Sequence, residues 1–211
     1  MKGYSAQQVR DAEAPLLAAG VPLMRRAASA LASELRRPGI RRVLLYVGTG
    51  DNGGDALYAG AELASEGLDV AIIAAEDRMH DAALAEALGQ GAHVEPAARA
   101  AELVDASDVV VDGLVGIGSR GPLRGGALEL VIAAAGTRTP VVAVDVPSGI
   151  DPDTGALPGP VMPAVLTVTF GAIKAGLLLA PASSVVGRVK LVDLGLDLSG
   201  AVPLVDTSTG E

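Results

Sequence analysis

The segment that decides the fold is Arg42-Val43-Leu44-Leu45-Tyr46-Val47-Gly48-Thr49-Gly50-Asp51-Asn52-Gly53-Gly54-Asp55. Its uninterrupted apolar run, bounded by Arg42 and Gly48, is typical of a strand buried on both faces of a parallel sheet. The loop that follows has the spacing Gly48-x-Gly50-x-x-Gly53, and a helical pattern begins at about Asp55. Glycines with this spacing let backbone N–H groups approach a phosphate at a helix N-terminus. The segment therefore predicts a strand–loop–helix unit of a nucleotide-binding α/β fold.

The same loop carries acidic and amide side chains. Asp51, Asn52 and Asp55 place two carboxylates and an amide where a loop that only binds phosphate would avoid negative charge. This combination indicates a site that also holds a cation or transfers a proton.

Composition excludes several classes of function. The chain has 211 residues, half of them hydrophobic, which is enough for a large core and argues against disorder. One Phe, three Tyr, no Trp and a net charge of −9 argue against a surface that binds nucleic acid. The absence of cysteine excludes disulfides, thiolate zinc sites and a cysteine nucleophile. His80 and His93 lie in separate segments, and we interpret both as incidental.

Nothing in the sequence points to a membrane. The opening residues lack the apolar core of a signal peptide, and no uncharged apolar run approaches the roughly 20 residues of a membrane span. A cytoplasmic location is therefore expected.

Strands and helices alternate along the chain. Ser5-Ala6-Gln7-Gln8 is a capping box that predicts a helix to about Ala18, and a second helix is expected from Leu23 to about Arg37. Further helices are expected at 55–66, 79–89, 97–104 and 127–135, and strands at 68–74, 108–112, 141–144, 165–170 and 189–192. The alternation predicts a three-layer α/β/α Rossmann-like fold with a mostly parallel central sheet and two N-terminal helices. We expect a single domain over residues 1–211, with a loosely held tail from about Asp197.

Three of these strands end in polar or glycine-rich loops, at 48–55, 112–126 and 145–151. Ligands of open α/β sheets bind outside the carboxyl ends of the strands, so the three loops should converge on one crevice. Asn52, Asp112 and Ser148 would then offer oxygens to one point. A set of oxygen ligands with one carboxylate suits a hard, weakly charged cation such as potassium. The alternative is structural: Asp112 caps a helix or loop, and Ser148 supports a turn.

Asp145 follows directly after an expected strand. A partly desolvated carboxylate beside a bound nucleotide can act as a general acid or base. The alternative is that Asp145 accepts backbone hydrogen bonds in its own turn. Asp151 and Asp153 are expected to shape a turn.

Three cations lie near these loops. We interpret Lys174 as a solvated loop lysine in the first place, although it is also placed to pair with a phosphate or with a catalytic carboxylate. Arg120 and Arg124 in the second glycine loop are either phosphate contacts or ordinary surface charges.

Four motifs occur in a fixed order: Gly48-Thr49-Gly50-Asp51-Asn52-Gly53-Gly54-Asp55, Asp112-Gly113-Leu114-Val115-Gly116-Ile117-Gly118, Val144-Asp145-Val146-Pro147-Ser148-Gly149-Ile150-Asp151 and Leu166-Thr167-Val168-Thr169-Phe170-Gly171. Together with Gly20-Val21-Pro22-Leu23-Met24, they resemble the NAD(P)H-hydrate epimerase family, also called the YjeF N-terminal domain. The resemblance extends from about Tyr4 to Leu196 and implies a Rossmann-like three-layer fold.

The resemblance also implies an activity. Members of the family interconvert the R and S forms of hydrated NADH and NADPH, NAD(P)HX, at C6 of the nicotinamide ring. It implies Asp145 as the catalytic group and Asn52, Asp112 and Ser148 as potassium ligands. The implied substrate contacts are Asp51, Asn52, Gly53, Gly54, Asp55, Gly116, Ile117, Gly118, Ser119, Arg120, Gly121, Pro122 and Asp145. A homodimer and a separately encoded NAD(P)HX dehydratase would also be expected.

Two positions depart from the family pattern. Asp51 replaces the first Asn of the usual Asn-Asn-Gly-Gly-Asp, and Val165 stands where an Asp is common. Two other functions stay open. Glu76 is spaced to bind a ribose hydroxyl in an NAD-dependent dehydrogenase, and the same fold also serves as a non-catalytic nucleotide-binding or interaction module.

Overall fold

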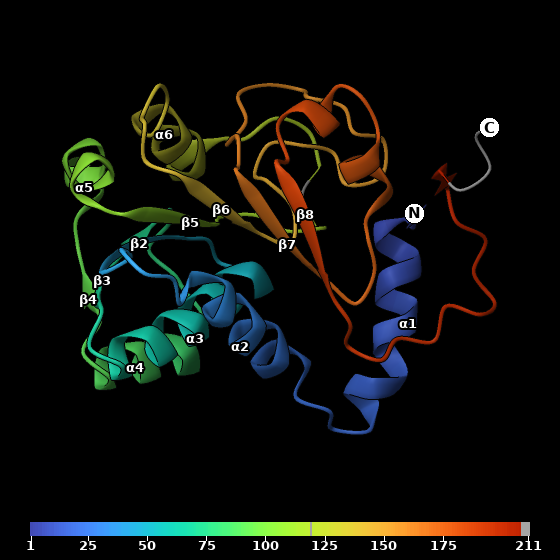
Figure 1. The fold of residues 1–211 in the computed structure, drawn as a ribbon, viewed down its shortest axis with the longest axis horizontal. Helices are drawn as coiled ribbons and strands as arrows, with labels where there is room; N and C mark the ends of the chain where they lie inside the picture. Colours follow the sequence, from blue (N-terminus) through green and yellow to red (C-terminus); the bar gives the residue numbers. More distant parts are fainter. Residues whose placement is uncertain (119, 208–211) are drawn as a thin grey trace.

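A seven-stranded sheet forms the centre of the molecule in the computed structural model, which describes residues 1–118 and 120–207 (Figure 1). Its strands are β2 (Arg42–Val47), β3 (Asp69–Ala74), β4 (His93–Val94), β5 (Val109–Gly113), β6 (Val141–Val144), β7 (Leu166–Phe170) and β8 (Arg188–Val192). The order across the sheet is β4-β3-β2-β5-β6-β7-β8, and each adjacent pair is parallel. The predicted parallel sheet is confirmed.

Helices cover both faces of the sheet. The helices are α1 (Ala6–Ala18), α2 (Leu23–Leu35), α3 (Asp51–Ser65), α4 (Asp81–Gly89), α5 (Ala100–Ala106) and α6 (Gly125–Ala133), with 3₁₀ turns η1 (Ala97–Arg99), η2 (Ala175–Leu178) and η3 (Ala182–Ser184). The sheet has a hydrophobic core on each face. Helices α2, α3 and α4 pack on one face, and α5 and α6 pack on the opposite face (Figure 1). This arrangement confirms the three-layer α/β/α fold.

The central strand β2 shows why the apolar run was informative. Val43, Leu45 and Val47 lie in the core under α2 and α3, whereas Leu44 and Tyr46 lie in the core under α5 and α6. Residues 44–47 are completely buried. Because the strand order reverses next to β2, between β2 and β5, a crevice opens at the carboxyl ends of these strands.

Several boundaries differ from the sequence prediction. Helix α3 begins at Asp51, not at about Asp55. Its first turn contains Gly53, which packs so closely against Gly48 that a Cβ at residue 53 would lie 2.2 Å from the Gly48 carbonyl oxygen. The apolar period that marks the helix starts only after these glycines. The expected helix over 97–104 is divided between η1 and α5, and α6 begins at Gly125. The capping box of α1 is present as predicted.

The segment after Asp197 is held more firmly than expected. Strand β9 (Val205–Asp206) pairs antiparallel with β1 (Lys2–Gly3). The Gln8 side chain also donates a hydrogen bond to the Val202 carbonyl, 2.7 Å away. The prediction of a loose tail is therefore wrong up to residue 207, since backbone hydrogen bonds to the N-terminal strand hold its end.

Candidate active site

The polar residues at the strand ends converge as the sequence predicted. Asn52 lies in the first turn of α3, Asp112 near the end of β5, and Ser148 in the loop after β6, and all three are buried. The Asn52 side-chain nitrogen donates to the Val144 carbonyl at 2.6 Å and to the Val115 carbonyl at 2.9 Å. These bonds tie the loops after β2, β5 and β6 together.

Asp112 and Ser148 form the deepest part of this cluster. The Ser148 hydroxyl and backbone N–H donate to the two Asp112 oxygens at 2.6 and 2.7 Å, and the Leu114 N–H donates at 3.3 Å. Asp112 is completely buried, and this burial raises its pKa to about 6 even though hydrogen bonds from Ser148 and Leu114 act in the opposite direction. The described hydrogen-bond partners of Asp112 are all neutral, so no described residue supplies it with a counter-charge.

The oxygen of the Asn52 amide remains available to a ligand. It accepts no hydrogen bond within the described part of the chain, and it faces Gly116, where a Cβ would lie only 2.4 Å away. Asn52, Asp112 and Ser148 thus offer an amide, a carboxylate and a hydroxyl oxygen, a donor set that fits a hard cation. Asp112 also has the structural role given above as the alternative, because it accepts hydrogen bonds from the backbone N–H groups of Leu114 and Ser148 in the loops after β5 and β6. Among residues 1–118 and 120–207, no group of three His, Cys, Asp or Glu could hold a metal.

Asp145 has a different environment. It follows β6 with a left-handed backbone conformation, φ 64°, which is uncommon for a residue other than glycine. Its Oδ1 accepts hydrogen bonds from the Lys174 ammonium, from the Thr169 hydroxyl at 3.0 Å and from the Phe170 N–H at 3.1 Å. These donors belong to β7 and the loop after it, so the alternative that Asp145 only stabilises its own turn is not what the structure shows. Its Oδ2 accepts no hydrogen bond from a described residue.

The interpretation of Lys174 as a solvated lysine is wrong. Lys174 is 1% exposed, forms a buried ion pair with Asp145 and donates a further hydrogen bond to the Phe170 carbonyl at 2.8 Å. The sequence held a signal for this position, because Lys174 is the one charged residue in the apolar stretch 170–179. A lone charge in such a stretch is costly unless it is paired.

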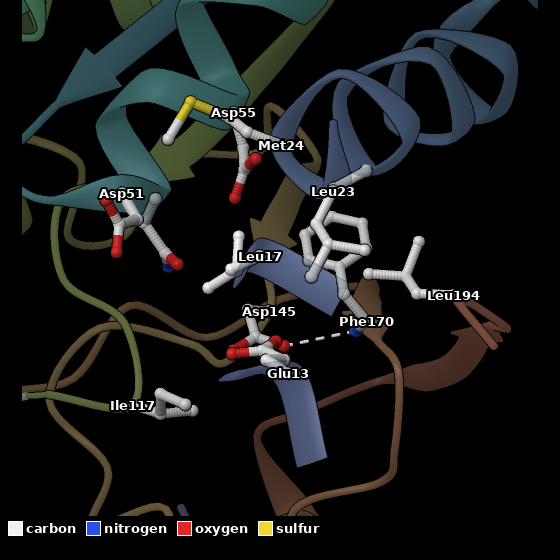
Figure 2. Close-up of a pocket in the computed structure, with 12 residues that line it drawn as sticks. Glu13, Leu17, Leu23, Met24, Asp51, Asp55, Ile117, Asp145, Phe170 and Leu194 are labelled. Carbon is white, nitrogen blue, oxygen red and sulfur yellow. Dashed lines mark hydrogen bonds between the residues drawn. The ribbon is translucent and has the colours of Figure 1, made fainter. Parts of the chain in front are cut away.

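Asp145 lies at a cavity of about 240 Å³ (Figure 2). Apolar side chains such as Leu23, Met24 and Phe170 line one side, and Glu13, Asp51, Asp55 and Asp145 supply carboxyl groups. A second cavity of about 550 Å³ shares Glu13, Leu17, Asp51, Asn52 and Ile117 with the first and extends along the glycine loops. The two cavities therefore form one crevice. The part that contains Asp55 and Asp145 is called the inner compartment, and the part along the glycine loops is called the outer compartment.

Asp55 lies in the inner compartment with no partner. It is 7% exposed, and within the described residues no hydrogen bond or ion pair to its carboxyl is present. Burial raises its pKa well above the usual range, and the nearby charges of Asp145 and Asp51 raise it further. In Figure 2 the carboxyl oxygens of Asp55 point from α3 towards the side of the cavity where Asp145 lies.

The family can be read from comparisons with known proteins. A family model described as "YjeF-related protein N-terminus" matches residues 20–176. A protein of Clavibacter michiganensis named "NAD(P)H-hydrate epimerase" is 49% identical, with 96% of this chain and 94% of that protein aligned. This chain belongs to the YjeF N-terminal family.

One further relative and one solved structure also match this chain. A Mycobacterium tuberculosis protein named "Bifunctional NAD(P)H-hydrate repair enzyme Nnr" is 47% identical; the match spans 93% of this chain and 42% of that protein. The crystal structure of a yeast protein matches the fold with a TM-score of 0.73 at 20% identity, covering 90% of this chain and 87% of the other. The aligned mycobacterial part thus corresponds to nearly the whole of this chain.

Some of the substrate contacts that the resemblance to the YjeF family implies line the crevice, and others do not. Asp51, Asn52, Asp55, Gly116, Ile117, Gly118 and Asp145 line the crevice. Gly53 and Gly54 instead face protein, where Gly54 packs against Met24 and His80. Arg120 is exposed and lies 3.4 Å from Asp153, and Gly121 and Pro122 line neither cavity. Ser119 lies outside the described residues.

The sequence reasoning missed the walls that the N-terminal helices provide. Arg10, Glu13 and Leu17 of α1 line the crevice, together with Leu23 and Met24 of α2. The helix pattern predicted both elements, but no local signal indicates which surface a helix covers.

Asp151 shapes the expected turn by accepting hydrogen bonds from the N–H groups of residues 153 and 154.

Proposed function

We propose that this protein interconverts the R and S forms of hydrated NADH and NADPH at C6 of the nicotinamide ring, with Asp145 as its acid–base group. The family and the epimerase relatives support the reaction, and the crevice at the carboxyl ends of the strands supports the site. The observation that carries the proposal is Asp145: one carboxylate oxygen is held by Lys174, Thr169 and Phe170, and the other is free beside a cavity.

The chemistry of the substrate explains why such a group is needed. C6 carries a hydroxyl and is bonded to the ring nitrogen, so its configuration inverts when the C6–O or the C6–N bond breaks and re-forms. Either route moves a proton onto or off oxygen, and a positioned carboxylate contributes roughly 10²- to 10⁴-fold to such a transfer. No electron transfer takes place, so the protein needs no hydride acceptor.

The nucleotide part of the substrate would occupy the outer compartment. There the backbone of the loops around Gly50 and Gly116 meets the N-terminus of α3, which no side chain caps. Backbone N–H groups at a helix N-terminus favour a diphosphate. Arg10 lines the same compartment and adds a positive charge to it.

We further propose that a potassium ion binds Asn52, Asp112 and Ser148. The free amide oxygen of Asn52 and the absence of a counter-charge beside Asp112 support this assignment. When bound, the ion would offset negative charge near the diphosphate and help to fix the loops.

The dehydrogenase alternative has weaker support. Glu76 lies on the surface beyond β3 and lines neither cavity of the crevice. The apolar inner compartment also offers no histidine as a hydride-transfer acid.

The proposal extends to partners and location. We propose a homodimer that acts beside a separate NAD(P)HX dehydratase in the cytoplasm. No helix in the described parts of the chain has the length and apolarity needed to cross a membrane. Sedimentation velocity tests the dimer, and a single species at the monomer mass would exclude it.

The direct test is chromatographic separation of the NADHX epimers after one epimer is mixed with the protein in potassium or sodium buffer. Wild-type protein should speed equilibration, and more so in potassium. Asp145→Asn should lose the activity and keep its fold, whereas Asp77→Asn, an exposed aspartate outside the crevice, should match wild type. No acceleration by wild-type protein in either salt would favour a binding module instead, and full activity of Asp145→Asn would remove Asp145 from the mechanism.

A further inference from the structure

The inner compartment contains a second buried carboxyl that the proposed function leaves unused. Asp55 on α3 and Asp145 after β6 line the same cavity and come from different layers of the fold (Figure 2). Both are nearly inaccessible to solvent, with 7% and 6% of each residue exposed. Their surroundings differ sharply.

Asp145 has a lysine and two other hydrogen-bond donors, whereas Asp55 has none among the described residues. The described charges that act on Asp55 are mostly of its own sign: Asp51 on its own helix, Glu13 on α1 and Asp145, with Lys174 as a nearby cation. Leu23 and Met24 add apolar surface from α2. A carboxyl in such a place is most stable with its proton on, while the partner beside a lysine is stable as a carboxylate.

A cavity that holds one carboxyl without a partner among the described residues and one paired with a lysine has the two members of an acid–base pair. Resting on the proposed function, we infer that Asp55 is a second catalytic residue, which exchanges a proton with the oxygen at C6 on the ring face opposite to the one that Asp145 serves. An inversion needs this arrangement, because the hydroxyl departs from one face and returns to the other.

The reaction balances without any other reagent. Asp55 gives its carboxyl proton to the C6 hydroxyl, the C6–O bond breaks with its electron pair leaving on water, and the nitrogen lone pair forms a C6=N double bond. A water molecule then adds to C6 from the other face, the electron pair of the double bond returns to nitrogen, and Asp145 takes the surplus proton. The net result is one inverted centre and one proton moved from Asp55 to Asp145. The reverse inversion starts from this product state, with Asp145 protonated and Asp55 ionised, and exchange of both protons with solvent restores the first state.

Neighbouring carboxyls fit this role less well. Asp51 is exposed at the start of α3. Glu13 is half-buried on α1 and also borders the outer compartment, where the nucleotide would lie. Asp55 alone among these three is both buried and directed into the inner compartment from a core helix.

The test compares wild type with Asp55→Asn, and Asp77→Asn is the surface control. Asp55→Asn keeps the size of the side chain and removes the transferable proton. We expect epimer equilibration to slow by 10²-fold or more, while the thermal midpoint and the affinity for NADPH, measured by fluorescence, stay at wild-type values. Asp55→Glu should recover part of the rate. Wild-type reactions in ¹⁸O-labelled water should place one labelled oxygen at C6 for each inversion at early times.

The outcomes separate a failure of the proposed function from a failure of the role of Asp55. If wild type does not equilibrate the epimers, the proposed function fails. If wild type is active and Asp55→Asn is equally active, the function stands and the role of Asp55 is refuted. Inversion by wild type without oxygen exchange would refute the C6–O cleavage step. A combined loss of NADPH affinity and thermal stability in Asp55→Asn would make Asp55 a structural residue.

Discussion

Asp112 and Asp145 occupy comparable places, near the ends of the adjacent strands β5 and β6, yet the protein treats them differently. Both are buried carboxyls reached by several hydrogen-bond donors. The donors to Asp112 are all neutral, whereas Asp145 has the ammonium of Lys174. A buried charge is tolerated only when it is paired. Asp145 therefore has a counter-charge within this chain, whereas Asp112 has none among the described residues.

The largest effect should come from removing the internal cation. Lys174→Met leaves Asp145 buried without its counter-charge, and breaking a buried ion pair from one side costs about 3–5 kcal/mol. We expect a loss of stability of this order, measured by urea unfolding, together with the loss of epimerisation. The double variant Lys174→Met, Asp145→Asn should regain much of the stability, because the uncompensated charge is gone, but no activity. A stability loss below about 1 kcal/mol in the single variant would mean that the pair is solvated.

The second prediction concerns Asp112, whose carboxyl has no charged partner among the described residues. The folded-state pKa of Asp112 is raised to about 6, so the folded protein binds more protons than the unfolded chain between about pH 4 and 6. The contribution of Asp112 to stability is therefore full at low pH and falls as pH rises through this range. Without potassium, thermal midpoints should show this fall.

Potassium should sharpen the same comparison. The gain in thermal midpoint from potassium, relative to choline at equal ionic strength, should grow as pH rises towards 6 and then level off. Asp112→Asn should lose this gain, whereas Asp145→Asn should keep it. An equal gain in Asp112→Asn would place the ion elsewhere.

The comparison also shows how far the sequence could lead. The apolar runs at 43–47 and 109–111 predicted the buried strands. The binding of ligands at the carboxyl ends of strands in open α/β sheets predicted that the loops after them would meet. Asp112 and Asp145 were identified because each ends an apolar run. Their partners were harder to identify, since Ser148 lies 36 residues from Asp112 and Lys174 lies 29 from Asp145.

Burial of a charged side chain is a tertiary property. Lysine is usually a surface residue, and only the apolar stretch around Lys174 indicated that it is buried. The start of α3 was misjudged for a related reason, because Gly53 weakens helix propensity but is needed for close contact with Gly48. The walls provided by α1 depend on packing between segments far apart in sequence.

An intermediate effect is expected from crowding the free oxygen of Asn52. A Cβ at Gly116 would lie 2.4 Å from it, so Gly116→Ala must displace the amide or the loop. We expect roughly tenfold slower epimerisation, about 1.4 kcal/mol, and a smaller response to potassium, measured in the same chromatographic assay. Gly89→Ala, at the end of α4 with nothing within 4 Å of the new Cβ, is the matched control and should behave as wild type. Unchanged potassium dependence in Gly116→Ala would argue against Asn52 as a ligand.

The smallest effect should come from Thr169, which accepts a hydrogen bond from Lys174 at 3.3 Å and donates one to Asp145 at 3.0 Å. Thr169→Val keeps the shape and removes both bonds, so it should cost about 1 kcal/mol of stability and slow epimerisation a few-fold. Thr167→Val is a close control, since its hydroxyl is equally buried on β7 but donates to the Val186 carbonyl, away from the site. Both variants should lose similar stability in urea unfolding, and only Thr169→Val should lose activity. If the two lose activity equally, the hydroxyl of Thr169 serves the fold and not the orientation of Asp145.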